Sequence, residues 1–302
     1  MGTNEDTNRP AEAPPARRAA RAVAVAFATV SGSLALLVGS LVFGFLALLA
    51  SALPPRGDWT YRVARLWARC YLAASFVRVR ASFVSPPRAD GRFVLMANHQ
   101  SVYDIPALLV AWPGQARFMA KRSLFRIPVF GWAMRAGGFI PVDRRNPAQA
   151  PEAFAAATAH LAAGTSVVLF PEQMRSRDGR LLPFQRGGFL LALKSRLPIL
   201  PAGIEGARAV QRRGSLVVRP GIVDVRFGAP VDVAGRRVRE ARPGGELLAE
   251  VRRDGPAALV AYRRGLAIGE RNLARDPRDP RWLTDVAISH DEIGKLLLDD
   301  GD

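Results

Sequence analysis

The sequence has little cysteine and little lysine. Cys70 is the only cysteine among 302 residues, which excludes a disulfide framework, an iron–sulfur cluster and a zinc site built on thiolates. Lys121, Lys194 and Lys295 are the only lysines, so 40 of the 43 cationic residues are arginines. With 26 acidic residues the formal charge is +17. Such a surplus fits nucleic acid, anionic lipid or a phosphorylated substrate.

Charge is entirely absent between Arg21 and Arg56. This apolar run exceeds the roughly 20 residues that a bilayer-crossing helix needs. Four arginines precede it and four follow closely, so the positive-inside rule gives a tie, which suits a segment with both ends on the cytoplasmic face. We predict a disordered arm over 1–21 and a membrane anchor over 22–77, either spanning or re-entrant.

The second half of this anchor reads as an amphipathic helix from Trp59 to Ala74. Apolar residues recur at helical spacing, and Arg62, Arg65 and Arg69 line another face. This pattern is typical of a helix in the headgroup layer. It also fits an amphipathic helix packed on a soluble domain, and periodicity does not choose between the two.

From residue 78 to about 240 the pattern predicts an α/β domain. Short runs rich in Val, Ile and Phe predict buried strands at 93–97, 139–142, 166–170 and 199–202. Helix candidates lie between or beside them at 102–111, 130–136, 150–163 and 188–195. This alternation predicts a mixed, largely buried sheet flanked by helices.

A histidine and an aspartate follow the first predicted strand, in the segment Asn98 to Asp104. A neutral imidazole is suited to accept a proton near pH 7, and a nearby carboxylate can fix its tautomer and stabilise the cation formed. No serine or cysteine nucleophile with its own elbow motif is apparent nearby. We therefore expect His99 to act as a general base for a substrate hydroxyl.

Cationic residues follow the other predicted strands. Arg144 and Arg145 follow the strand ending at Val142, Arg175 and Arg177 follow Pro171–Glu172, and Lys121 follows another short apolar run. Arginine suits bidentate phosphate recognition. Loops that follow neighbouring strands meet at one sheet edge, so an anion pocket is expected there.

These blocks resemble the glycerolipid acyltransferase family, in particular the 1-acyl-glycerol-3-phosphate acyltransferases. The four blocks stand in the family's order: Asn98-His-Gln-Ser-Val-Tyr-Asp104-Ile-Pro106, Gly138-Phe-Ile-Pro-Val-Asp-Arg144, Phe170-Pro-Glu-Gln-Met-Arg-Ser176 and Leu197-Pro-Ile-Leu-Pro201-Ala-Gly203. The third departs from the family pattern, with Gln173-Met174 in place of Gly-Thr.

The resemblance implies an O-acyltransferase acting on a lysolipid, most directly 1-acyl-sn-glycerol 3-phosphate. His99 would be the base and Asp104 its orienting partner. Lys121, Arg144, Arg175 and Ser176 would bind the acceptor, and Glu172 would contact the glycerol or organise Arg175. Asn98, Pro171 and Pro201 would shape the site. The co-substrate would be acyl-coenzyme A or acyl carrier protein, with no further cofactor and no metal.

The remaining expectations concern partners and the C-terminus. Residues 241–302 predict a helical extension that includes a hairpin resembling a tetratricopeptide-type repeat, or an unrelated helical extension. The expected partners are membrane lipids at the cytoplasmic face of the inner membrane, with no nucleic acid; nothing indicates an oligomeric state. A lyso-ornithine lipid remains an alternative acceptor, and a non-catalytic membrane-tethered lipid-binding or scaffold protein remains an alternative function.

Overall fold

A computed structural model of the chain describes residues 14–54, 57–85, 91–143, 146, 149–236 and 251. Its helices are α1 (Pro15–Ala50), α2 (Asp58–Ala74), α3 (Asp104–Ala111), α4 (Phe130–Ala136), α5 (Ala150–Ala162), α6 (Gly187–Ser195) and α7 (Ala207–Val210), with a short 3₁₀ helix η1 at Arg122–Arg126. Its strands are β1 (Val77–Phe83), β2 (Val94–Ala97), β3 (Ala116–Lys121), β4 (Ile140–Val142), β5 (Ser166–Leu169), β6 (Ile199–Glu205) and β7 (Gly221–Phe227).

The strands form one mixed sheet in the order β1-β7-β6-β2-β5-β3-β4. Neighbouring strands from β6 to β4 are parallel, whereas β7 runs antiparallel to β6 and parallel to β1. Strands β2, β3, β4, β5 and β6 therefore all end at the same edge of the sheet. The predicted functional residues follow these strand ends.

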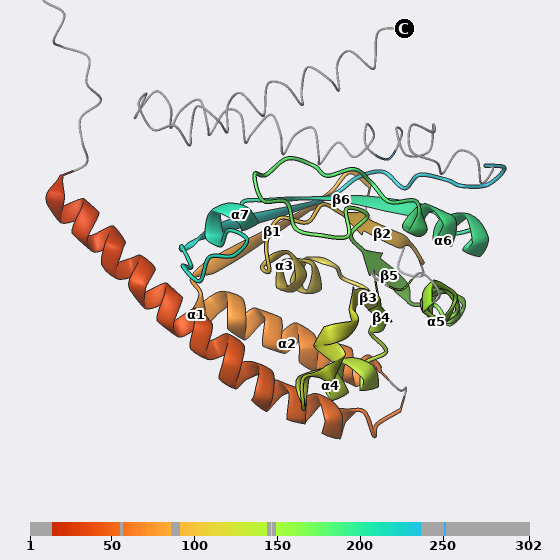
Figure 1. Cartoon of the computed structure of the whole chain (residues 1–302), viewed down its shortest axis with the longest axis horizontal. Helices are drawn as coiled ribbons and strands as arrows, with labels where there is room; N and C mark the ends of the chain where they lie inside the picture. Colours follow the sequence, from red (N-terminus) through yellow and green to blue (C-terminus); the bar gives the residue numbers. More distant parts are fainter. Residues whose placement is uncertain are drawn as a thin grey trace, which may run out of the picture.

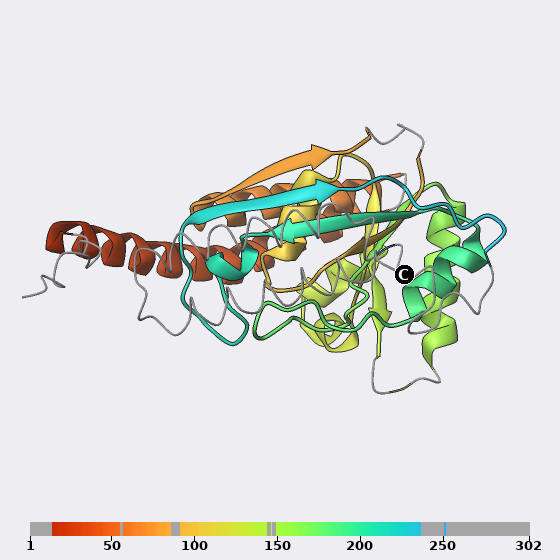
Figure 2. The same ribbon diagram turned by 90° about the horizontal axis from the view of Figure 1, so that it is seen from above.

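Helices cover both faces of the sheet (Figures 1 and 2). Leu95 and Ala97 of β2 belong to the core shared with α2 and α3, whereas Val94 and Met96 belong to the core shared with α5 and α6. All four residues are buried. Because successive side chains of a strand point to opposite faces, a strand covered on both sides is apolar throughout, which is why β2 and β5 were predicted from short apolar runs.

Helix α1 forms an outer layer that packs along α2 and α4 (Figure 1). Its buried positions are all small residues: Ala28, Gly32, Gly44 and Ala47. A Cβ on Gly32 would lie only 2.7 Å from the Ser75 Oγ. Small residues thus let the two backbones approach closely. Of the described helices, α1 alone is long and apolar enough to cross a membrane, and 11% of its most apolar window is buried.

The sheet and its flanking helices confirm the predicted fold class. Helix α1 begins at Pro15, earlier than the predicted anchor, because proline suits the first helical turn and Ala and Arg favour the helix. The residues of the predicted arm from Pro15 to Arg21 are therefore helical. Strands β1, β3 and β7 were not predicted. The C-terminal hairpin predicted within 241–302 lies outside the described residues.

Candidate active site

His99 and Asp104 lie together where β2 passes into α3. The His99 Nδ1 is 2.8 Å from the Asp104 Oδ2, and the same oxygen accepts the backbone N–H groups of Gln100 and Ser101 at 2.7 and 2.8 Å. Asp104 is completely buried, and the His99 side chain is 12% exposed. Since an ionised carboxylate only accepts hydrogen bonds, Nδ1 carries the proton and Nε2 is left to accept one.

The ring of His99 is also held by its neighbours. It stacks on Phe170, with ring centroids 4.0 Å apart and an interplanar angle of 15°. Beside Asp104, the Tyr103 hydroxyl donates to the Ser75 Oγ at 2.8 Å, and Ser75 contacts α1 at Gly32. The turn that carries His99 and Asp104 therefore packs both against the residue that follows β5 and towards the apolar N-terminal helix.

Asn98 joins this turn to β6. Its side-chain amide donates to the Ile204 carbonyl at 2.9 Å and accepts the Ile204 N–H at 2.6 Å. Pro201 lies in β6 opposite Met96 and is buried. Both residues therefore lie where β6 runs beside β2 and the turn that carries His99.

The loop after β5 is built on Glu172. One carboxylate oxygen accepts the His99 N–H at 2.7 Å, and the other accepts the Leu182 N–H at 2.8 Å. Ser176 donates its N–H to the His99 carbonyl at 2.9 Å and its hydroxyl to Asp178 at 2.9 Å. The buried Pro171 adds its carbonyl, which accepts the Gln185 N–H. Glu172 thus holds the backbone around His99.

Gln173 adopts an unusual backbone conformation in this loop. Its φ is +60°, and the Met174 N–H donates to the Glu172 carbonyl at 2.8 Å, which defines a γ-turn with positive φ, a strained conformation. The family pattern has glycine here, the residue that tolerates positive φ. Met174 follows with 51% of its surface exposed.

Gln173→Gly is therefore expected to stabilise the protein by about 0.5–1 kcal/mol, because relief of strain outweighs the added freedom of the unfolded chain. Urea unfolding of the purified protein in detergent measures this change. Gln173→Ala is the matched control, since alanine shortens the side chain but keeps the strain. A glycine variant no more stable than the alanine variant would contradict a strained turn.

Cationic groups lie beside the buried carboxylate. Arg175 is half-buried, and its pKa is lowered by burial and by the charge of Arg213, while the charge of Asp104 acts in the opposite direction. Arg213 donates from Nη1 to the Arg175 carbonyl at 2.7 Å. Arg213 was not predicted, because it stands far along the sequence in a loop with no motif of its own.

The other predicted cations follow β3 and β4. Lys121 is exposed at the end of β3 and pairs in register with Val142, the last residue of β4. Arg144 lies outside the described residues. The structure therefore brings His99, Asp104, Glu172, Arg175 and Ser176 together and places Lys121 at the same strand-end edge.

This arrangement defines a class of site. A histidine oriented by a buried carboxylate can act as a general base, and half-buried guanidinium groups can hold an anionic substrate. In the described loops that contact His99, neither serine hydroxyl is bonded to the imidazole: Ser176 donates to Asp178, and Ser101 donates to the Gln211 carbonyl. The site suits direct transfer to a substrate hydroxyl.

Comparison with known proteins agrees with this class. Residues 77–205 match the acyltransferase family. The chain is 34% identical over 161 residues to a chloroplastic 1-acyl-sn-glycerol-3-phosphate acyltransferase of Brassica napus, covering 53% of this chain and 46% of that protein. It is 34% identical over 132 residues to the human alpha enzyme of that name, covering 43% and 46%.

A solved structure extends the similarity. The crystal structure of the 1-acyl-sn-glycerophosphate acyltransferase PlsC from Thermotoga maritima superposes with a TM-score of 0.64 at 26% identity, covering 76% of this chain and 94% of that one. The matched part of the chain spans about half the length of the curated relatives. The similarity includes the strands and loops that carry the site.

Proposed function

We propose that this chain is a membrane-bound O-acyltransferase that converts 1-acyl-sn-glycerol 3-phosphate to phosphatidate. The observation that carries the proposal is the hydrogen bond of 2.8 Å between His99 Nδ1 and the buried Asp104, within a segment that matches the acyltransferase family. The named relatives support the choice of acceptor.

In the proposed reaction His99 Nε2 removes the proton from the free hydroxyl of the lysolipid. The oxygen attacks the carbonyl carbon of an acyl thioester, and Asp104 stabilises the imidazolium through the Nδ1–H bond. Collapse of the tetrahedral intermediate breaks the carbon–sulfur bond, and the thiolate takes the proton from the imidazolium. The products are the ester and the free thiol of coenzyme A or acyl carrier protein, and no other cofactor or metal takes part.

The acceptor phosphate is assigned to the cationic loops. Arg175 contributes because its guanidinium is half-buried near the charges of Asp104 and Arg213. One carboxylate does not balance two guanidinium groups, and the phosphate would supply the missing negative charge. Lys121 contributes from the end of β3, and we assign the same role to Arg144, which stands two residues after β4 in the sequence. Glu172 acts through the backbone of His99, and Ser176 closes the same loop.

The outer face of α1 supports attachment to a membrane. Its exposed large residues include a row at helical spacing (Val23, Phe27, Val30, Leu34, Leu37, Leu41, Phe45 and Leu49) and four residues beside that row (Leu36, Val38, Val42 and Leu46). The opposite face is docked from Ala28 to Ala47, a length of about 28 Å at 1.5 Å per residue. Because a spanning helix exposes its apolar surface to lipid over about 30 Å, this docking favours the re-entrant or in-plane form over the spanning form.

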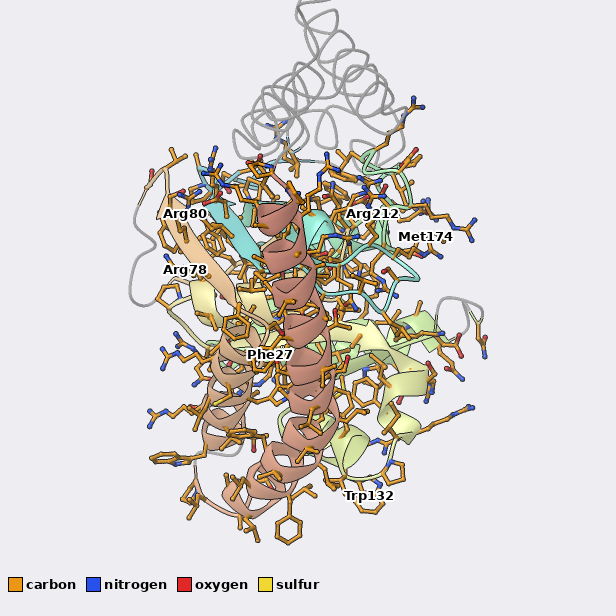
Figure 3. All side chains as sticks on the ribbon, turned by 90° about the vertical axis from the view of Figure 1, so that its left-hand side faces the viewer. Phe27, Arg78, Arg80, Trp132, Met174 and Arg212 are labelled. Carbon is orange, nitrogen blue, oxygen red and sulfur yellow. The ribbon has the colours of Figure 1, made fainter. Side chains whose placement is uncertain are left out.

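The site loops lie beside this helix. Met174 and Arg212 lie to one side of α1, and Arg78 and Arg80 lie to the other (Figure 3). The Val218 N–H donates to the Thr29 Oγ1 of α1 at 3.0 Å. A lysolipid held in the membrane leaflet that α1 contacts would therefore reach the site from the side of α1. We assign the N-terminus to the cytoplasmic face of the membrane. Protease accessibility of the N-terminus in sealed membrane vesicles tests this assignment.

A purified assay tests the function. Release of thiol from oleoyl-coenzyme A and from oleoyl-acyl carrier protein is measured with no acceptor, with lysophosphatidate and with lyso-ornithine lipid. We expect release that depends on lysophosphatidate. Release that follows only lyso-ornithine lipid would reassign the acceptor, and no acceptor-dependent release would favour a non-catalytic lipid-binding protein.

A further inference from the structure

The short loop after α7 contacts both halves of the candidate site. The Ser101 hydroxyl, in the turn that carries His99 and Asp104, donates to the Gln211 carbonyl at 2.8 Å. Two residues further on, Arg213 donates to the Arg175 carbonyl at 2.7 Å. The loop is therefore held in place at two points, one on each of the loops that form the site.

This arrangement holds two cations close together. Arg175 and Arg213 are both half-buried, and the charge of Arg213 is one of the causes that lower the Arg175 pKa. The nearby carboxylate of Asp104 already accepts three hydrogen bonds at one oxygen. Two guanidinium groups brought together repel each other unless an anion lies between them. A phosphate monoester, with two negative charges and three acceptor oxygens, satisfies both.

We propose that Arg213 is a second guanidinium contact for the phosphate of the acceptor, which is bound between the loop after β5 and the loop after α7. One N–H of Arg213 holds the Arg175 carbonyl, and among the described residues its other N–H groups have no partner, which leaves them for phosphate oxygens. Arg213 lies outside residues 77–205, which match the family. This assignment rests on the proposed function, because it presumes an acceptor that carries a phosphate.

The test compares Arg213→Gln with Arg212→Gln. Arg212 is adjacent and exposed, so its replacement removes the same charge from the same loop. Steady-state rates are measured while lysophosphatidate and oleoyl-coenzyme A are varied in turn. We expect Arg213→Gln to raise the KM for lysophosphatidate about 10- to 100-fold, as for loss of a hydrogen bond to a charged group, with the KM for oleoyl-coenzyme A unchanged. Arg212→Gln is expected to change either constant less than about twofold.

Arg213→Lys separates phosphate binding from a purely structural role. Lysine keeps the charge but lacks the fork of donors, so it is expected to give a KM for lysophosphatidate between those of the wild type and Arg213→Gln. It also serves as the test if Arg213→Gln does not fold. Equal increases in both KM values, or no difference between the Arg213 and Arg212 variants, would overturn the proposal. If the wild type itself gave no lysophosphatidate-dependent thiol release, the proposed function would fail instead.

Discussion

His99→Ala is expected to lower the rate of acyl transfer by roughly 10²–10⁴-fold, the usual contribution of a positioned general base. Alanine removes the Nε2 that would take the proton of the acceptor hydroxyl, and the other histidine among the described residues, His160, does not lie at the site. His160 is the last-turn histidine of α5 on the other side of the sheet, and its imidazole lies against Gly138. The measurement is the initial rate of thiol release from oleoyl-coenzyme A at saturating lysophosphatidate.

The fold is expected to survive this change. The backbone of His99 still bonds to Glu172 and Ser176, and those bonds do not involve the imidazole. His290→Ala is the matched control, because His290 lies outside residues 77–205. A folded His99→Ala protein with near-wild-type activity would exclude His99 as the base.

Asp104→Asn is expected to lower kcat by roughly 10³–10⁴-fold, as expected when the partner of a catalytic histidine fixes the wrong tautomer. The amide can donate to Nδ1, which then leaves Nε2 protonated and unable to accept the substrate proton. Because the Gln100 and Ser101 N–H groups share the oxygen that His99 contacts, an amide nitrogen at that position also removes their acceptor. The loss is therefore expected in kcat, with the KM for lysophosphatidate changed little.

Asp178→Asn is the control for this variant. Asp178 is also near the site, where it accepts the Ser176 hydroxyl and the Arg180 N–H. It has no bond to His99 among the interactions of the described residues. If Asp104→Asn and Asp178→Asn lowered kcat equally, Asp104 would have no special role in orienting the base.

Sequence patterns predicted β2, β4, β5 and β6 and missed β1, β3 and β7. The strands β2, β5 and β6 are apolar because helices cover both of their faces, and each produces a short run of Val, Ile and Leu. Strand β1 lies at the edge, where Arg78 and Arg80 are exposed, and Arg80 pairs with Asp224 of β7 at 2.7 Å. These exposed charged residues at alternate positions interrupt the apolar run from which a buried strand is predicted.

The candidate site was predictable where its parts are local. His99 and Asp104 meet within one turn, so one short segment contains both, and the cationic loops that follow the other strands add to the evidence for the pair. Arg213 lies after α7, far along the sequence from the other site residues, and no local sequence motif predicts its place at the site. Glu172 was predicted as a substrate contact or a partner of Arg175, and its oxygens accept backbone N–H groups of His99 and Leu182. Hydrogen bonds to the backbone leave no trace in the residue pattern.

The most direct test of the account is the stoichiometry of the wild-type reaction set against that of His99→Ala. Purified protein in vesicles is given oleoyl-coenzyme A and lysophosphatidate, and free thiol and phosphatidate are measured in the same samples. We predict one phosphatidate formed for each thiol released, and a loss of both products in His99→Ala. Thiol release without phosphatidate, or equal product formation by the two proteins, would contradict acyl transfer driven by His99.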